Sequence, residues 1–416
     1  RPGDKPVSVR GRGLIWDPRS RSFEATSGGG QHGMGMDDWG RKFLCSNVNP
    51  MQLLMYDGRY IARNPFFAPP RAAVTINAAG RLMKLHRISP LEPWRIERSR
   101  AIAASPRDDE EVSWPGGVFT SASGITIYRG DAWPQAYRGN LFVGEVANNL
   151  VYRAKLEANG LGLLARRADR DSEFLASTDT WFRPVQFANA PDGNLYVVDM
   201  YRELIEGAAF VPPRLLKELD PRSGTDRGRI YRIVFVGGNS APSKSNEPLP
   251  HKLATTNELI ELLEHPNGWH RETATRLIYE QQDRRGVNRL RQLATTSKSP
   301  TARVHALYAL HGLSRLEPDV ILPRLADSHP EVRVHAVRLS ESVARDSPKI
   351  HAKLLSLVDD GDLRVRYQVA FSRGAFPGLD SYRALAILLE RDGANPWVRA
   401  AVQSSLLQGA GDVFVA

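Results

Sequence analysis

A short pattern recurs along the sequence after residue 250, and this repeat limits the possible folds more than any other feature. Each copy begins near a Pro or Gly, carries an early arginine and continues with apolar residues at helical spacing. Apolar stretches of the same period lie between the copies, so each unit is predicted to be two antiparallel helices. Helix pairs repeated at this spacing stack into an α-solenoid. The clear copies are SPTARVHALYAL (299–310), HPEVRVHAVRLS (329–340), DGDLRVRYQVAF (360–371) and NPWVRAAVQSSL (395–406), aligned through Arg303, Arg333, Arg364 and Arg399 at spacings of 30, 31 and 35, and a looser copy places Arg271 another 32 residues upstream.

The repeated polar residues of these copies are expected to be structural. His305 and His335 occupy equivalent positions of two copies, which is typical of packing positions rather than of metal or catalytic sites. The repeated arginine is expected to pair with an aspartate of a neighbouring unit or with a helix C-terminus. The helix pairs resemble short HEAT repeats, a class of protein-interaction repeats.

Before residue 237 the apolar residues follow a period of two instead. Short runs rich in β-branched and aromatic residues are separated by Asp-Gly, Asn-Gly or Gly-Asn turns, and no amphipathic helix of useful length interrupts them. An apolar pair, a turn with Asp and Gly, and an apolar strand recur, which favours a β-propeller over a sandwich or barrel. The runs include MGMDDWGRKFLCSN (34–47), GITIYRG (124–130), LFVGEVANNLVYRAKL (141–156), VQFANAPDGNLYVVDMY (185–201) and RIYRIVF (229–235).

The change of period divides the chain into two domains. The segment GGNSAPSKSNEPLP (237–250) has the composition of a linker. We therefore expect a β-propeller over residues 1–236 and a solenoid of HEAT-like repeats over residues 251–416. Only four or five blades fit before the linker, so the propeller is expected to be incomplete. Both ends are expected to be truncated, because Arg1 falls in mid-pattern and the chain stops inside an apolar helical segment.

Composition excludes several classes of function. Cys45 is the only cysteine, which excludes an intrachain disulfide, a cysteine zinc site and a covalently attached c-type haem within these residues. No run of 18 apolar residues is present, so no membrane span is expected. The formal net charge of +10 is spread along the chain without an aromatic stacking motif, so nucleic-acid binding is not expected.

Three segments carry a family resemblance. They are ASGITIYRGDAWPQAYRGNLFVGEVANNLVYRAKLEANG, WFRPVQFANAPDGNLYVVDMYRELIE and GTDRGRIYRI. The sequence resembles the "membrane-bound dehydrogenase domain" family of planctomycetes and verrucomicrobia, whose members join a propeller to HEAT-like repeats, often with a cytochrome c domain beyond. That family is in turn similar to soluble quinoprotein sugar dehydrogenases, six-bladed propellers that hold pyrroloquinoline quinone (PQQ) and calcium.

The resemblance implies a cofactor site around Arg183. An arginine before the strand that leads to the Pro-Asp-Gly turn contacts the quinone in such enzymes, and a guanidinium suits quinone carbonyls. We expect Arg183 to point into the propeller channel, near His32 and Asp199. The sequence departs from the pattern at Ala147, where a quinone-contacting lysine is expected. The residues implied are Arg183, Trp181, Tyr201 and Arg202 for the cofactor, Asp199 and Glu206 for calcium, and His32, offset by about three residues, as the general base.

Each of these residues also has a structural interpretation. Asp199 and Tyr201 are typical of a polar network that satisfies backbone groups at a strand end. Trp181 is typical of an aromatic buried between blades, and Arg229 of an ion-pair partner on a blade edge.

Two functions follow from the sequence. The first is a periplasmic or secreted oxidoreductase acting on a carbohydrate or alcohol, which passes electrons to a cytochrome domain outside this chain. The alternative is a non-catalytic interaction scaffold in which propeller and repeats both bind partners. Such enzymes carry a second arginine two residues before the first, where this chain has Trp181. The missing lysine and this missing arginine favour the scaffold, whereas Arg183 favours the enzyme.

Overall fold

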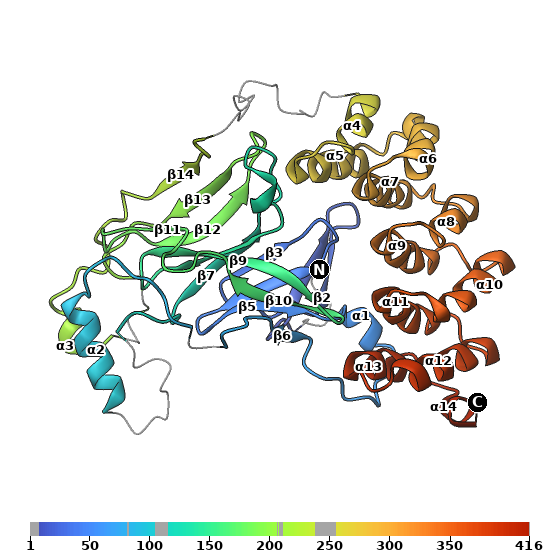
Figure 1. The fold of residues 1–416 in the computed structure, drawn as a ribbon, viewed down its shortest axis with the longest axis horizontal. Helices are drawn as coiled ribbons and strands as arrows, with labels where there is room; N and C mark the ends of the chain where they lie inside the picture. Colours follow the sequence, from blue (N-terminus) through green and yellow to red (C-terminus); the bar gives the residue numbers. More distant parts are fainter. Residues whose placement is uncertain are drawn as a thin grey trace.

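The computed structural model describes residues 8–80, 83–104, 115–205, 207, 211–237 and 255–415. Antiparallel sheets form the first part of the chain and helices form the second, as the change of period predicts (Figure 1). Residues 238–250 of the predicted linker lie outside the described residues. In the described part of the chain, no helix is long and apolar enough to cross a membrane.

A hairpin and three antiparallel sheets make up the first part. In each sheet the main strands pair in chain order, so each sheet is a meander. The hairpin is β1 (Gly13–Asp17) with β2 (Ser22–Thr26), and the sheets are β3 (Gly33–Met36), β4 (Lys42–Ser46), β5 (Asn49–Leu54) and β6 (Ala73–Thr75); β7 (Ala122–Ile127), β8 (Leu141–Glu145), β9 (Leu150–Asn159) and β10 (Gly162–Arg167), with β11 (Leu175–Ala176) also on β9; and β12 (Pro184–Asn189), β13 (Leu195–Asp199) and β14 (Arg229–Ile233).

The first strands of the three sheets, β3, β7 and β12, lie side by side with β7 in the middle. Glycines permit this close approach. A Cβ on Gly35 would lie 2.7 Å from the carbonyl oxygen of Ile125, and one on Gly124 would lie 2.7 Å from Cα of Gln186. Gly124 also has a φ of +56°, which side chains disfavour. Among the described residues, the sheets do not join into a closed barrel or a closed ring of blades.

Three short helices interrupt the strands, although the sequence predicts none of useful length. They are α1 (Gly58–Ile61), α2 (Pro93–Ala103) and α3 (Pro213–Leu216). Helix α2 has 11 residues and starts with a proline in its first turn, a position that proline favours. It buries Trp94, Arg95 and Ser99. This mixture of polar and apolar residues gives no clear apolar stripe, and for that reason the periodicity does not reveal the helix.

The second part of the chain consists of stacked helices, which confirms the predicted helix pairs. Helices α5, α7, α9, α11 and α13 form the layer next to the sheets, and the others form an outer layer (Figure 1). One continuous apolar core runs through the stack. The helices are α4 (Thr256–Leu262), α5 (Gly268–Gln281), α6 (Val287–Thr296), α7 (Pro300–Gly312), α8 (Pro318–Arg324), α9 (Pro330–Ser340), α10 (Pro348–Ser356), α11 (Leu363–Arg373), α12 (Leu379–Asp392), α13 (Pro396–Ser404) and α14 (Ala410–Val415).

A ladder of arginine–aspartate pairs joins successive units of the stack. Arg303 bonds to Asp327 at 2.7 Å, and Arg333 bonds to Asp360 at 2.7 Å. Nη1 of each arginine also donates to the carbonyl oxygen of the residue six positions earlier. The expected pairing of the repeated arginine with an aspartate of the next unit is thereby confirmed for Arg303 and Arg333.

The ladder corrects the sequence alignment at one copy. In α11 the residue that bonds to the carbonyl six positions earlier and to Asp392 of the next unit is Arg366, whereas the alignment uses Arg364. Arg364 pairs instead with Asp362 on its own helix turn and with Glu331. The segment LRVR contains two arginines two residues apart. Which of them reaches the next unit depends on the face of the helix on which each lies.

Candidate functional site

Arg183, the centre of the predicted cofactor site, is fully buried. Its guanidinium donates from Nη2 to Oε1 of Glu92 at 2.8 Å. It also donates to the carbonyl oxygens of Val146 at 2.8 Å, Arg202 at 2.9 Å and Glu203 at 2.6 Å. The sequence predicts that this side chain points into a water-filled channel. Its relative exposure is 0%, so it is buried within the protein instead. Burial is possible because Glu92 supplies the counter-charge.

Four other predicted residues gather around the backbone of Arg183. Oδ1 of Asp199 accepts from the backbone N–H of Arg183 at 2.8 Å and of Tyr201 at 2.9 Å. The backbone N–H of Arg202 donates to the carbonyl of Trp181 at 3.1 Å. The rings of Trp181 and Tyr201 lie 5.6 Å apart. These contacts match the structural interpretation, in which the cluster satisfies the backbone at the end of a strand.

The electrostatics of Asp199 fit the same interpretation. Burial raises its pKa, although the two backbone hydrogen bonds oppose the change. Its Oδ2 is buried without a hydrogen bond, and Nε of Arg229 lies 3.9 Å away. The Arg229 guanidinium stacks over Tyr201 at 3.8 Å from the ring centroid. Arg229 is therefore the ion-pair partner at the sheet edge that the sequence suggests.

The remaining predicted residues do not complete a catalytic centre. His32 is exposed just before β3, and its backbone bonds to Cys45 and Gly124. It is not among the side-chain partners of Arg183 described above. Glu206 lies outside the described residues, so its predicted calcium role cannot be placed. Within the described ranges, no group of three or more His, Cys, Asp or Glu side chains is arranged to hold a metal ion.

The residues present do not fit a quinone at Arg183. Nε, Nη1 and Nη2 of Arg183 all donate to acceptors of the protein itself. A quinone would have to displace Glu92 or a main-chain carbonyl, and each displaced group would be left buried without its partner. We therefore derive no chemical step through a quinone.

The exposed face of the inner strands borders a second cavity. Met34 and Met36 of β3 are 53% and 41% exposed there. A cavity of about 210 Å³ lies between these strands and α5, and its charged lining residues, Arg129 and Glu272, form an ion pair of 2.7 Å. Asn189, also on this wall, donates to the carbonyl of Ile127.

Polar contacts also join the sheets to the helices, in a region that we call the junction. At one end of it Asp38, in the turn after β3, pairs with Arg129 at 2.9 Å and with Arg271 of α5. Burial would raise the pKa of Asp38, but Arg271 and Arg129 outweigh it and the pKa is lowered. The backbone N–H of Gly268 donates to the carbonyl of Arg129 at 3.0 Å. The first arginine of the repeat series thus connects the stack to the sheets.

At the other end of the junction, α1 inserts Tyr60 into the core of the helices. Tyr60 is 1% exposed, and its ring stacks on Phe371 of α11 at 4.6 Å. Its hydroxyl donates to Oε1 of Glu341 at 2.8 Å and accepts from Nε2 of Gln368 at 2.9 Å. Arg63 also bonds to the carbonyl of Phe371 at 2.7 Å. Burial raises the pKa of Tyr60 to about 12, so the hydroxyl keeps its proton.

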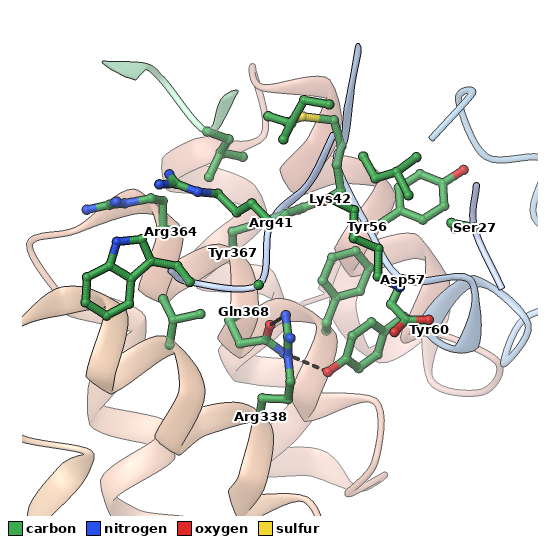
Figure 2. A pocket seen from close by; sticks show the side chains of 18 of the residues that line it. Ser27, Arg41, Lys42, Tyr56, Asp57, Tyr60, Arg338, Arg364, Tyr367 and Gln368 are labelled. Atoms are coloured by element: carbon green, nitrogen blue, oxygen red, sulfur yellow. Dashed lines mark hydrogen bonds between the residues drawn. The ribbon is translucent and has the colours of Figure 1, made fainter. Parts of the chain in front are cut away.

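A cavity of about 150 Å³ lies between these two ends (Figure 2). On the sheet side, Trp39 stacks on His329 at 4.7 Å and marks the edge of the cavity. On the helix side, Glu331 bonds to Arg364 at 2.6 Å and lies 3.7 Å from Arg41. Sequence reasoning misses this region because the interacting residues lie far apart in the chain.

The fold therefore defines a class of protein in which meandering sheets are joined to helical repeats. Comparison with known families matches residues 1–236 to the family described as "Domain of unknown function (DUF7133)". Since this is more than half of the sequence, the chain belongs to that family. Residues 318–406 match the family described as "HEAT repeats". A search of curated proteins finds no match.

Proposed function

We propose that this chain is a protein-interaction scaffold. The sheets and the repeats hold each other through the junction, and a partner protein adds an extended strand to the free edge of β14. HEAT-type repeats support an interaction role as a class. The observation that carries the proposal is the edge of β14.

Strand β14 pairs with β13 on one side, and its other edge has no strand partner among the described residues. Tyr231 contacts the Phe182 ring at 6.1 Å, and Ile233 packs against the core. Ile230 on the opposite face is 67% exposed, and beyond the strand Val234 and Val236 are 46% and 92% exposed. Arg229 and Arg232 also lie on β14, so this edge carries both apolar and charged side chains. The free edge of a strand is a template for strand addition, and proteins commonly use it to bind extended segments.

The neighbouring sheets indicate what is missing beside β14. The sheets that begin with β3 and β7 each continue to a fourth strand, whereas in the described part of the chain the sheet that begins with β12 ends at its third. We propose that the three sheets are consecutive blades of a propeller, because their first strands lie side by side and their strands pair outward in chain order. The partner strand would then occupy the fourth position of the third blade. Its chemistry is an extended segment with an apolar side chain that matches Ile230.

The oxidoreductase hypothesis stays a prediction, together with its PQQ, calcium, cytochrome partner and periplasmic location. It requires the Arg183 guanidinium to exchange its protein acceptors for a ligand. A titration of the full chain with PQQ and calcium, followed by tryptophan fluorescence, tests it. We expect no saturable change at micromolar PQQ, and saturable quenching that Arg183→Lys weakens would favour the enzyme.

The scaffold is tested by cross-linking in the producing cell. A photo-reactive phenylalanine analogue replaces residue 230 in the full chain, and cross-linked peptides are identified by mass spectrometry. We expect the probe to join one extended segment of one other protein. Val234→Lys in the same chain should reduce the yield several-fold, because charged side chains on an edge oppose strand addition.

The matched control places the same probe at residue 387, since Ile387 is 45% exposed on α12, far from β14. Products shared equally by the two positions would contradict the proposal. Cross-links only to a second copy of this chain would also contradict a partner protein, and would show self-association at the edge.

A further inference from the structure

We propose that the junction cavity binds a small organic carboxylate, with its acid group against Arg338 and its apolar body against the aromatic wall. This site is separate from the β14 edge and does not depend on the proposed scaffold function.

Two helix faces of identical spacing form one side of the cavity. Glu331, Val334, His335 and Arg338 line it from α9. Arg364, Tyr367, Gln368 and Phe371 line it from α11, each 33 residues after its counterpart. Residues spaced three, four and seven apart share one face of a helix, so both faces are directed at the sheets. Figure 2 shows Arg338 beside Gln368, with Tyr60 next to them.

The positive charges around the cavity are only partly compensated. Arg41 bonds to Asp37 at 2.6 Å, and Arg364 bonds to Asp362 and Glu331. In contrast, neither Arg338 nor Lys42 has a carboxylate within 4.0 Å among the residues that the structure describes. Nη2 of Arg338 donates to the neutral Oε1 of Gln368 at 3.2 Å. A partly buried guanidinium without a nearby carboxylate favours an anionic ligand.

Hydrogen-bond donors of the cavity wall also lack partners. Nε of Arg338 is buried without a hydrogen bond. The hydroxyl of Tyr308 lies 3.0 Å from Nδ1 of His335. If Tyr308 donates to Nδ1, the proton of the neutral imidazole lies on Nε2. His335 is 5% exposed, and its Nε2 makes no hydrogen bond of normal geometry, although the Trp39 backbone lies near it.

The other residues that line the cavity indicate which kind of anion would fit it. Tyr56, Tyr60, Tyr367 and Phe371 present aromatic surface on the same cavity. An apolar cavity of about 150 Å³ holds benzene in another protein, so a six-membered ring carrying one carboxylate suits this size. A guanidinium recognises a carboxylate through two parallel hydrogen bonds. We therefore choose a ring carboxylate, with benzoate as the probe, rather than inorganic phosphate.

The test is a titration of the full chain with sodium benzoate, followed by saturation-transfer NMR. We expect saturable binding at millimolar concentration or tighter, weakened at least about tenfold by Arg338→Gln. The matched control is Lys155→Gln, which removes an exposed lysine of β9 and should leave the affinity unchanged. Lys42→Gln provides a second test if Arg338→Gln does not fold, and it should weaken binding several-fold.

Three results would overturn the proposal. The first is an absence of saturable benzoate binding to the wild-type chain. The second is a benzoate affinity that changes by the same factor in Lys42→Gln and in the control Lys155→Gln. The third is phosphate that binds through Arg338 more tightly than benzoate, which would replace the carboxylate with another class of anion.

Discussion

The guanidinium of Arg183 organises the loops at the start of β12. Glu92, its acidic partner, also accepts from Arg95 at 3.0 Å and from Arg87 at 3.4 Å. One carboxylate therefore accepts hydrogen bonds from three guanidinium groups. Main-chain carbonyl oxygens accept the other hydrogen bonds of Arg183. Charges buried in this way are costly to separate, because the remaining partner keeps an unpaired charge out of water.

Replacing Arg183 should therefore destabilise the sheets. We expect Arg183→Met to lower the free energy of unfolding by about 3 kcal/mol, measured by urea denaturation. Arg166→Met is the control, because Arg166 of β10 and its partner Glu157 are both exposed and its loss should cost less than about 1 kcal/mol. Equal stability of the two variants would show that the buried pair does not support the fold.

The sequence could indicate the position of Arg183 but not the direction of its side chain. Its place before an inner strand follows from the Pro-Asp-Gly turn and the apolar pattern. Its burial depends on Glu92, which lies 91 residues earlier, just before a helix that has no apolar stripe. A local pattern cannot reveal such a distant counter-charge.

Among the elements, helix α11 carries two nearby arginines, Arg364 and Arg366, of which only Arg366 belongs to the arginine–aspartate ladder. The side chain of Arg366 is 9% exposed and bonds to Asp392, whereas that of Arg364 is 34% exposed. We expect Arg366→Met to reduce the free energy of unfolding by about 3 kcal/mol and Arg364→Met by about 1 kcal/mol. Urea denaturation measures both, and a larger loss for Arg364→Met would contradict the assignment from helix phase.

The stacked helices should also lose stability in acid. Burial lowers the pKa of His305 and of His335 to about 3, and nearby arginines add to the effect. The ordinary value is about 6.5, so between pH 6.5 and 3 the unfolded chain binds more protons than the folded chain. The free energy of unfolding therefore falls as the pH falls through this window.

Removing both histidines tests this dependence. We expect the wild-type chain to lose about 2 kcal/mol more than His305→Gln/His335→Gln between pH 6 and pH 5, in urea denaturation at each pH. Acidic groups affect both proteins alike, so the difference isolates the histidines. Parallel pH profiles would mean that these imidazoles are not buried in the neutral form.

At the scale of the whole molecule, the sequence predicts the order of the parts better than their contacts. Sheets before residue 237 and helix pairs after it follow from periods of two and of 3.6. The contacts of the junction cannot be predicted from these periods, because Tyr60 and Glu341 are 281 residues apart. Each residue belongs to a segment whose local pattern carries no sign of the other. From the sequence, Asp38 likewise looks like an ordinary turn residue. Only the structure shows that it pairs with Arg271.

The central claim is that the sheets and the repeats form one scaffold, and scanning calorimetry of the intact chain tests it most directly. We expect a single unfolding peak for the wild-type chain. Tyr60→Ala should lose about 3 to 5 kcal/mol and split the peak in two, because the variant removes the ring from the core of the repeats. Tyr60→Phe, which keeps the ring, should retain one peak at a lower temperature. Two separate peaks in the wild-type chain, both unchanged by Tyr60→Ala, would contradict the claim.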